Sequence, residues 1–176
     1  KIIYCVDCFG NNLFDVVFIG EAEEAILEYC QRLQENPTDI VGTVVKLTGG
    51  KYVNNGVRQL EKDLDHYPYP DWELFDYENL YDMKTHKRGI MTASRGCPYK
   101  CSFCSIEKYH DIYKDKGMFV RFKSVDYVIR EAKAMKKRYP AIEYIHFVDD
   151  VLVTRQDWMK EFSEKRVIIH FLMECF

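Results

Sequence analysis

One short stretch decides the fold: Ser94-Arg95-Gly96-Cys97-Pro98-Tyr99-Lys100-Cys101-Ser102-Phe103-Cys104-Ser105-Ile106. Its cysteines have the spacing C-x3-C-x2-C, with an aromatic residue just before the last one. Three thiolates from one loop suit a cubane iron–sulfur cluster that keeps one iron without a protein ligand. An open coordination position is what a catalytic metal site needs and a structural one lacks. The motif therefore predicts Cys97, Cys101 and Cys104 as metal ligands in a catalytic site.

A zinc knuckle is the alternative interpretation of these cysteines. Structural zinc usually takes four ligands, often as two C-x2-C pairs. Only Cys101 and Cys104 form such a pair, and the nearest other cysteines, Cys30 and Cys175, lie about seventy residues away along the chain. The spacing thus favours the iron–sulfur interpretation and leaves a zinc-binding module open.

Alternating strands and helices surround the motif in the second half of the chain. A strand at Arg88–Ala93 leads into the cysteines, and Ser124 is a good N-cap for a helix over 125–138. A buried strand follows at Ile142–Val148, then a helix that starts near Thr154, with a capping box to Asp157, and runs through about Lys165. A third strand is expected at Val167–Leu172. This order predicts the first units of a parallel β/α barrel.

The first half of the chain reads as the end of another α/β domain. A buried strand at Phe14–Ile19 stops at Gly20, and a helix to about Gln34 follows, with Ala25, Ile26, Tyr29 and Leu33 as its expected buried stripe. This strand–glycine–helix unit is typical of a doubly wound layer. A hairpin is expected around Thr48-Gly49-Gly50. The predicted organisation is a first domain over 1–56, a linker rich in proline and aromatic residues over 57–87, and the barrel over 88–176.

Composition narrows the class of protein. The chain has 176 residues and a net charge of −3, which argues against a nucleic-acid surface. It has no apolar run of about 18 residues, so no membrane span is expected. Seven cysteines, three of them clustered, do not resemble a secreted disulfide framework, and a cytoplasmic location is expected.

Two adjacent acids, Asp149 and Asp150, end the second strand of the expected barrel. The carboxyl ends of barrel strands form the ligand-binding face. A carboxylate at that position can pair with an ammonium group of a ligand. The alternative is that one or both acids only terminate the strand or cap the next helix.

The cysteine motif, placed after a barrel's first strand, resembles that of the radical S-adenosylmethionine (SAM) superfamily. The resemblance implies that the three cysteines hold a 4Fe–4S cluster, that its fourth iron binds SAM, and that Phe103 lies near the adenine. Phe147-Val148-Asp149-Asp150 resembles the aromatic-x-Asp-Asp sequence of subfamilies with an N-terminal cobalamin-binding domain. In them the end of this strand contacts the SAM amino group, which implies that role for Asp149 and Asp150.

The N-terminal half resembles the same subfamilies. Gly20-Glu21-Ala22-Glu23 is similar to their Gly-Glu-Gly-Glu, with Ala22 replacing the second glycine. The resemblance implies that Gly20 and Glu21 face cobalamin. The fold class expected is therefore α/β: the C-terminal part of a Rossmann-like cobalamin-binding domain followed by the first units of a partial, TIM-like radical SAM barrel.

The activity implied is cleavage of SAM to a 5′-deoxyadenosyl radical, with cobalamin-dependent methylation of an unactivated carbon. The partners implied are a small-molecule or peptide substrate and an electron donor such as flavodoxin or ferredoxin. Radical cyclisation or oxidation without methyl transfer is the runner-up, and a non-catalytic iron–sulfur or zinc module stays open. A methylthiolating tRNA enzyme is disfavoured by the acidic balance of the chain.

Overall fold

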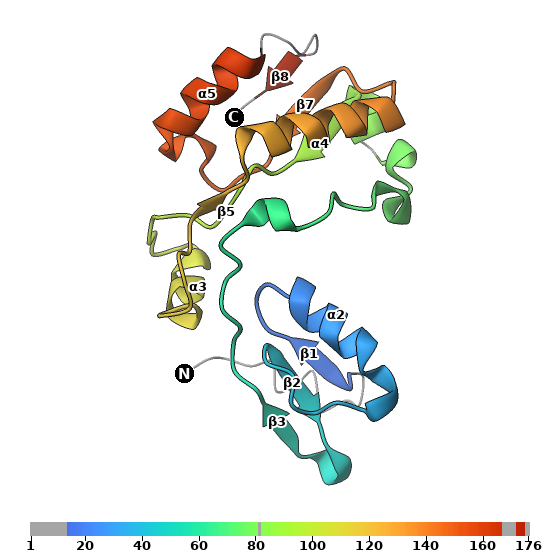
Figure 1. Cartoon of the computed structure of the whole chain (residues 1–176), viewed down its shortest axis with the longest axis vertical. Helices are drawn as coiled ribbons and strands as arrows, with labels where there is room; N and C mark the ends of the chain where they lie inside the picture. Colours follow the sequence, from blue (N-terminus) through green and yellow to red (C-terminus); the bar gives the residue numbers. More distant parts are fainter. Residues whose placement is uncertain (1–13, 81, 167–171, 175–176) are drawn as a thin grey trace. The chain divides into compact units, whose positions relative to one another are not determined.

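The computed structural model describes residues 14–80, 82–166 and 172–174. The chain forms two compact units (Figure 1). The N-terminal unit combines residues 1–61 with 99–119, and the C-terminal unit combines residues 62–98 with 120–176. Neither unit is a continuous stretch of sequence, because the second half of the cysteine motif belongs to the first unit.

The N-terminal unit contains a three-stranded sheet and a helix. Strand β1 (Val16–Phe18) pairs with β2 (Thr43–Lys46), and β2 pairs with β3 (Tyr52–Asn54). Both pairings are antiparallel, so the predicted hairpin is confirmed. Helix α2 (Glu23–Gln31) connects β1 to β2. An α/β layer is therefore present, but the two strands that flank α2 lack the parallel pairing of a doubly wound unit.

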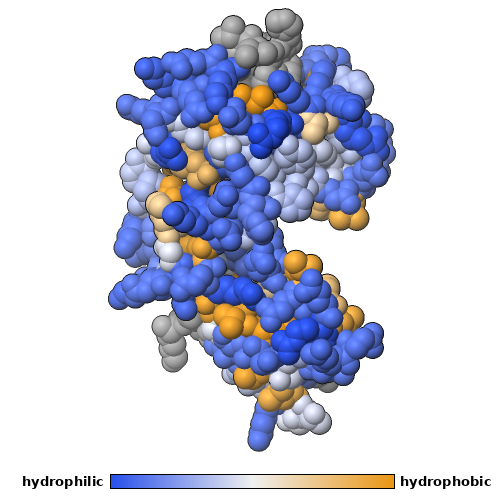
Figure 2. All heavy atoms as spheres, in the orientation of Figure 1, coloured by the Kyte–Doolittle hydropathy of each residue, from blue (hydrophilic) through white to orange (hydrophobic). Residues whose placement is uncertain are grey.

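The expected buried stripe of α2 is wrong for two of its four residues. Ala25 is buried and Tyr29 is half-buried, whereas Ile26 and Leu33 are exposed. Three short strands offer a single helix little surface to cover, so only part of its apolar face is packed among the described residues. Figure 2 shows apolar atoms at the surface of this unit.

The segment after the cysteine motif packs into the N-terminal unit. It contains helix α3 (Ile106–Ile112). A small apolar cluster joins it to the chain that leaves β3, with Val57, Leu60 and Tyr113 buried at its centre. The backbone N–H of Leu60 donates to the Lys116 carbonyl at 2.7 Å. Burial of this cluster holds residues 99–119 against the rest of the N-terminal unit.

The C-terminal unit is built on parallel strands. Strand β4 (Arg88–Met91) pairs with β7 (Tyr144–Phe147), which pairs with β8 (Leu172–Glu174). Helices α4 (Val125–Arg138) and α5 (Gln156–Arg166) connect them. Consecutive parallel strands with intervening helices are as predicted, while closure into a barrel stays a prediction. Most of the third predicted strand, residues 167–171, lies outside the described residues.

Helix α4 has the predicted bounds and cap. The Ser124 side chain accepts a hydrogen bond from the Tyr127 N–H at 3.1 Å. The cap of α5 differs from the prediction: α5 starts at Gln156, and the Thr154 hydroxyl donates to the Val151 carbonyl at 3.1 Å. Thr154 thus stabilises the turn before the helix and not its first N–H groups.

Most of the described core lies between α4, α5 and the parallel strands (Figure 1). The aromatic linker joins it, since Tyr77 is buried there and its ring centroid lies 5.1 Å from that of Tyr139. Linker aromatics thus pack on α4 and form part of this unit. Among the described helices, none combines the length and the apolar character needed to cross a lipid bilayer.

A two-stranded ribbon brackets the cysteine motif within the C-terminal unit. Strand β5 (Ser94–Arg95) pairs antiparallel with β6 (Arg121–Phe122). The Lys123 N–H then donates to the Ala93 carbonyl at 2.8 Å. The chain therefore leaves this unit and returns to it at neighbouring positions.

Candidate functional site

The cysteine motif follows β5 and begins with a tight bend. Gly96 has a φ of 84°, a left-handed conformation that glycine adopts without the penalty other residues pay. Further on, the Cys104 N–H donates to the Cys101 carbonyl at 2.9 Å. A bond of this kind closes a turn whose end Cα atoms lie within about 7 Å. The C-x2-C pair therefore lies on one turn, as two neighbouring metal ligands require.

All three cysteines of the motif carry thiols and none forms a disulfide. Cys101 is exposed, and Cys97 and Cys104 are half-buried. Their donor chemistry fits an iron–sulfur cluster, which is held by thiolates on a loop. Over the described part of the chain, however, no three His, Cys, Asp or Glu side chains are gathered as a metal site. The joint ligand role of the cysteines stays a prediction.

The aromatic residue inside the motif points away from the protein. Phe103 is 92% exposed. Water contact over almost the whole ring is unfavourable, and a flat ligand stacked on it would remove that contact. The proposed proximity of Phe103 to adenine stays a prediction.

The two acids after β7 have different surroundings. Asp149 is half-buried, and its Oδ1 and Oδ2 each lie 3.0 Å from the Ala93 N–H. The Ser94 N–H and hydroxyl both donate to Asp149 Oδ1. Asp150 is exposed. The sequence predicts the same role for both acids, whereas in the structure Asp149 is hydrogen-bonded to the chain that leads into the cysteines.

The predicted cobalamin loop is covered on one side by an aromatic residue. Gly20 has a φ of 75°, and a Cβ added there would lie 1.8 Å from the Tyr113 hydroxyl oxygen. That oxygen accepts a hydrogen bond from the Glu21 N–H at 2.5 Å. Gly20 is thus needed for close approach as well as for its backbone conformation. The role of Gly20 and Glu21 toward cobalamin stays a prediction.

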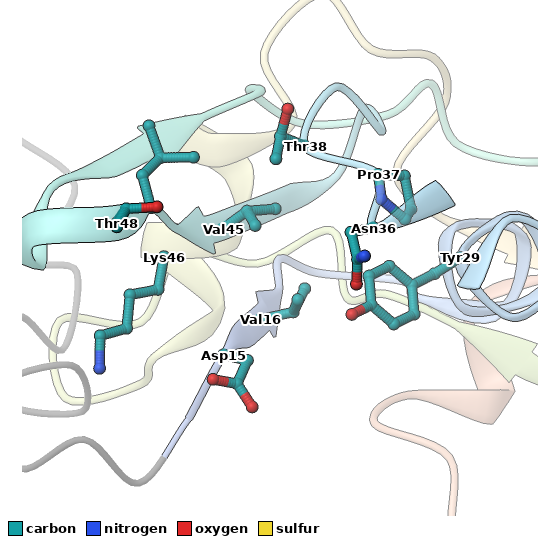
Figure 3. Close-up of a pocket in the computed structure, with 10 residues that line it drawn as sticks. Asp15, Val16, Tyr29, Asn36, Pro37, Thr38, Val45, Lys46 and Thr48 are labelled. Carbon is teal, nitrogen blue, oxygen red and sulfur yellow. The ribbon is translucent and has the colours of Figure 1, made fainter. Parts of the chain in front are cut away.

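A cavity of about 640 Å³ lies elsewhere in the N-terminal unit (Figure 3). Asp15 and Val16 of the β1 end, Tyr29 of α2 and Lys46 of β2 line it, together with the turn around Asn36. Asp15 and Val16 lie at the start of β1, whereas Gly20 follows the end of this strand. The cavity is therefore separate along the strand from the predicted cobalamin loop, and no sequence motif marked it.

Sequence reasoning missed three contributors to the site: Ser94, Tyr113 and the buried pair Lys123–Glu131. The pair is joined by a 2.7 Å contact between Nζ and Oε2, with the Glu131 side chain 2% exposed. Burial raises the pKa of Glu131, and the hydrogen bond from Lys123 opposes that shift. Helical spacing could have indicated Glu131, which lies three residues after Val128 and four before Met135, both buried.

Comparison with known proteins supports the interpretation of the motif. The model of the radical SAM superfamily matches residues 91–175. The cytidylyl-2-hydroxyethylphosphonate methyltransferase of Streptomyces wedmorensis is 23% identical over 88% of this chain and 33% of its own length. The anaerobic magnesium-protoporphyrin IX monomethyl ester cyclase of Rubrivivax gelatinosus is 25% identical over 87% of this chain and 27% of its own.

A solved structure shares the fold. The cobalamin-dependent S-adenosylmethionine radical enzyme OxsB, solved with aqua-cobalamin and S-adenosylmethionine bound, matches with a TM-score of 0.69 at 15% identity. The match covers 97% of this chain and 24% of OxsB. This chain thus spans a third or less of the length of these relatives. The cysteine motif and the parallel strands that follow it thus lie in the part of the chain, residues 91–175, that matches the radical SAM superfamily.

Proposed function

We propose that this chain is part of a radical SAM enzyme in which Cys97, Cys101 and Cys104 hold a 4Fe–4S cluster. The C-x3-C-x2-C motif carries the proposal, because three thiolates leave one iron open to SAM. When bound, the cluster supplies the electron that cleaves SAM to a 5′-deoxyadenosyl radical. The turn between Cys101 and Cys104 supports the proposal by keeping two of the ligands adjacent.

SAM would be bound by side chains at the carboxyl ends of the strands. Asp150 follows β7 and is exposed, so its carboxylate can pair with the SAM ammonium group. The exposed ring of Phe103 can cover the adenine. The chain's share of the chemistry is to bind and orient SAM and to exclude water. An electron donor of the flavodoxin or ferredoxin class would reduce the site.

The proposed outcome is cobalamin-dependent methylation of an unactivated carbon in a small-molecule or peptide substrate. Two findings support it: the similarity to a methyltransferase and the fold shared with a cobalamin-dependent enzyme. Cobalamin would lie against the loop at Gly20 and Glu21. Radical cyclisation is the second candidate, because the chain is also similar to a cyclase.

Replacement of each motif cysteine by Ala tests the cluster. After anaerobic reconstitution, the unchanged protein is expected to bind about four irons and to form 5′-deoxyadenosine from SAM. Cys97→Ala, Cys101→Ala and Cys104→Ala should each abolish that product. Cys30→Ala is the matched control, since Cys30 is an exposed thiol on α2. Retained turnover in a motif variant, or one tightly bound zinc in place of iron, would reject the proposal.

An absorption spectrum with added cobalamin tests the second cofactor. Binding should shift the cobalamin bands, and Gly20→Ala should weaken binding because its new side chain displaces the Tyr113 ring. Gly50→Ala is the control, with the same φ of 75° and open space around the added atom. Equal affinity in all three proteins would remove the assignment of the Gly20 loop.

A further inference from the structure

We infer that Asp149 is a positioning residue, whose carboxylate fixes the chain that leads into the cysteine motif. The Asp149 clasp is defined here as Asp149 with its donors Ala93 and Ser94. The inference deepens the proposed function, since it concerns the same cluster loop. It separates Asp149 from Asp150, which the sequence grouped together.

The clasp joins the carboxyl ends of two neighbouring parallel strands. In the register of β4 and β7, Met91 lies opposite Phe147. Pairing continues one residue further, where the Val148 N–H donates to the Met91 carbonyl at 3.0 Å. After this bond, the next hydrogen bonds between the two chain segments are accepted by the Asp149 side chain and no longer by the backbone of β7. Asp149 accepts from the backbone donors that follow β4, those of Ala93 and Ser94, for which β7 offers no backbone acceptor.

The hydrogen bonds of the Asp149 clasp are strong because their shared acceptor is a carboxylate. One carboxylate accepts from two backbone N–H groups, of Ala93 and Ser94, and from the Ser94 hydroxyl. Hydrogen bonds to an ionised acceptor are about twice as strong as those between neutral groups. Ala93 and Ser94 are both buried, which limits competition by water.

The Asp149 clasp holds the backbone just before Cys97, the first cysteine of the motif. Ala93 is held on both sides, because its N–H donates to Asp149 and its carbonyl accepts from the Lys123 N–H. Cys97 follows Ser94 after only two intervening residues, Arg95 and Gly96. Because the backbone of Ala93 and Ser94 is fixed this close to Cys97, the positions that the Cys97 thiol can take are restricted. Asp149 would therefore influence the position of Cys97 through the backbone of Ala93 and Ser94.

Amide hydrogen exchange of the metal-free protein tests the clasp directly. Asp149→Asn removes the charge and one acceptor oxygen, so the Ala93 and Ser94 amides should exchange at least about tenfold faster. Asp150→Asn is the matched control and should leave these two amides unchanged. Ser94→Ala, which keeps both backbone donors, should raise their exchange by ~3-fold. Unchanged exchange in Asp149→Asn overturns the inference; if that variant does not fold, unchanged exchange in Ser94→Ala does.

A spectroscopic measurement tests whether the clasp positions the cluster. In reconstituted Asp149→Asn with matched iron content, the electron paramagnetic resonance change on adding SAM should differ from that of the unchanged protein. Ile145→Val is the control for stability, because it trims the buried core of β7 without touching the clasp. An identical SAM-induced change in Asp149→Asn would leave Asp149 with no positioning role.

The two measurements separate this inference from the proposed function. Faster exchange in Asp149→Asn, in a protein that binds no cluster at all, would retain the clasp as a structural feature and reject the enzyme. A cluster that cleaves SAM, combined with unchanged exchange, would do the reverse.

Discussion

The two units hold the chain around the cysteine motif by different chemistry. In the N-terminal unit, residues 99–119 are held by an apolar cluster and by the neutral hydroxyl of Tyr113. In the C-terminal unit, the chain on either side of the motif is held by the Asp149 carboxylate and the ion pair Lys123–Glu131. Apolar packing depends on the shape of the side chains, whereas the carboxylate and the ion pair depend on charge and therefore on pH. The contacts that hold the chain on the two sides of the motif should therefore be lost under different conditions.

The largest expected effect is at the buried ion pair. Lys123→Met leaves the Glu131 carboxylate buried without the partner that the structure gives it, which should lower the free energy of unfolding by about 3–5 kcal/mol. Lys133→Met, at an exposed position of helix α4, which carries Glu131, should change it by less than about 0.5 kcal/mol. Denaturant titration at neutral pH measures both. Equal losses of unfolding free energy in the two variants would mean that the stability of the C-terminal unit does not depend on the Lys123–Glu131 ion pair.

The pH response of the same variant sharpens the comparison. Burial raises the pKa of Glu131 above its ordinary value of 4.5. The protonated form is thus favoured by folding, and stability from this group is present below that value and lost as pH rises through the raised pKa. The deficit of Lys123→Met should therefore shrink toward pH 4 and be largest at neutral pH. A deficit independent of pH would contradict the assigned cause.

The next largest effect is at the Gly20 loop. Gly20→Ala combines a left-handed backbone with a clash against Tyr113 and loss of its hydrogen bond, for about 2–3 kcal/mol in total. Gly50→Ala has the same φ and no clash, so it should lose only about 1 kcal/mol. Thermal unfolding of the two variants measures the difference between these losses, which is the part that comes from the clash with Tyr113 and from its lost hydrogen bond.

The smallest effect is at the Tyr113 hydroxyl. Tyr113→Phe keeps the ring in the apolar cluster and removes the acceptor of the Glu21 N–H, so it should lose about 1 kcal/mol. Tyr109→Phe, at an exposed ring of α3, should lose nothing measurable. In contrast to Lys123→Met, the loss in Tyr113→Phe should stay constant between pH 4 and neutrality (about 7), since no charge is involved.

Local patterns predicted the elements best where periodicity and caps agreed. Helix α4 has the predicted bounds, because Ser124, its apolar face and Pro140 all indicate the same helix. The pairing of β1 with β2 was beyond such patterns, since strand direction is set by neighbours distant in sequence. The proposed ligand role of the three cysteines rests on their spacing in the sequence alone.

The supporting contacts were harder to predict. Tyr113 meets Glu21 across 92 positions, and Asp149 meets Ala93 across 56. No local pattern encodes such distances. Asp149 and Asp150 are chemically identical in the sequence, and only the register of β4 and β7 decides which of them accepts the backbone donors.

The interleaving of the two units has a practical consequence for dissecting this protein. The peptide chain passes between them after residues 61, 98 and 119, so cutting it at one of these points leaves two covalent links intact. A fragment that ends at residue 61 would lose the partners of Val57, Leu60 and Ile19 and present that apolar surface to water. Such a fragment should aggregate, and a soluble half would have to carry residues 99–119 grafted in by a designed linker.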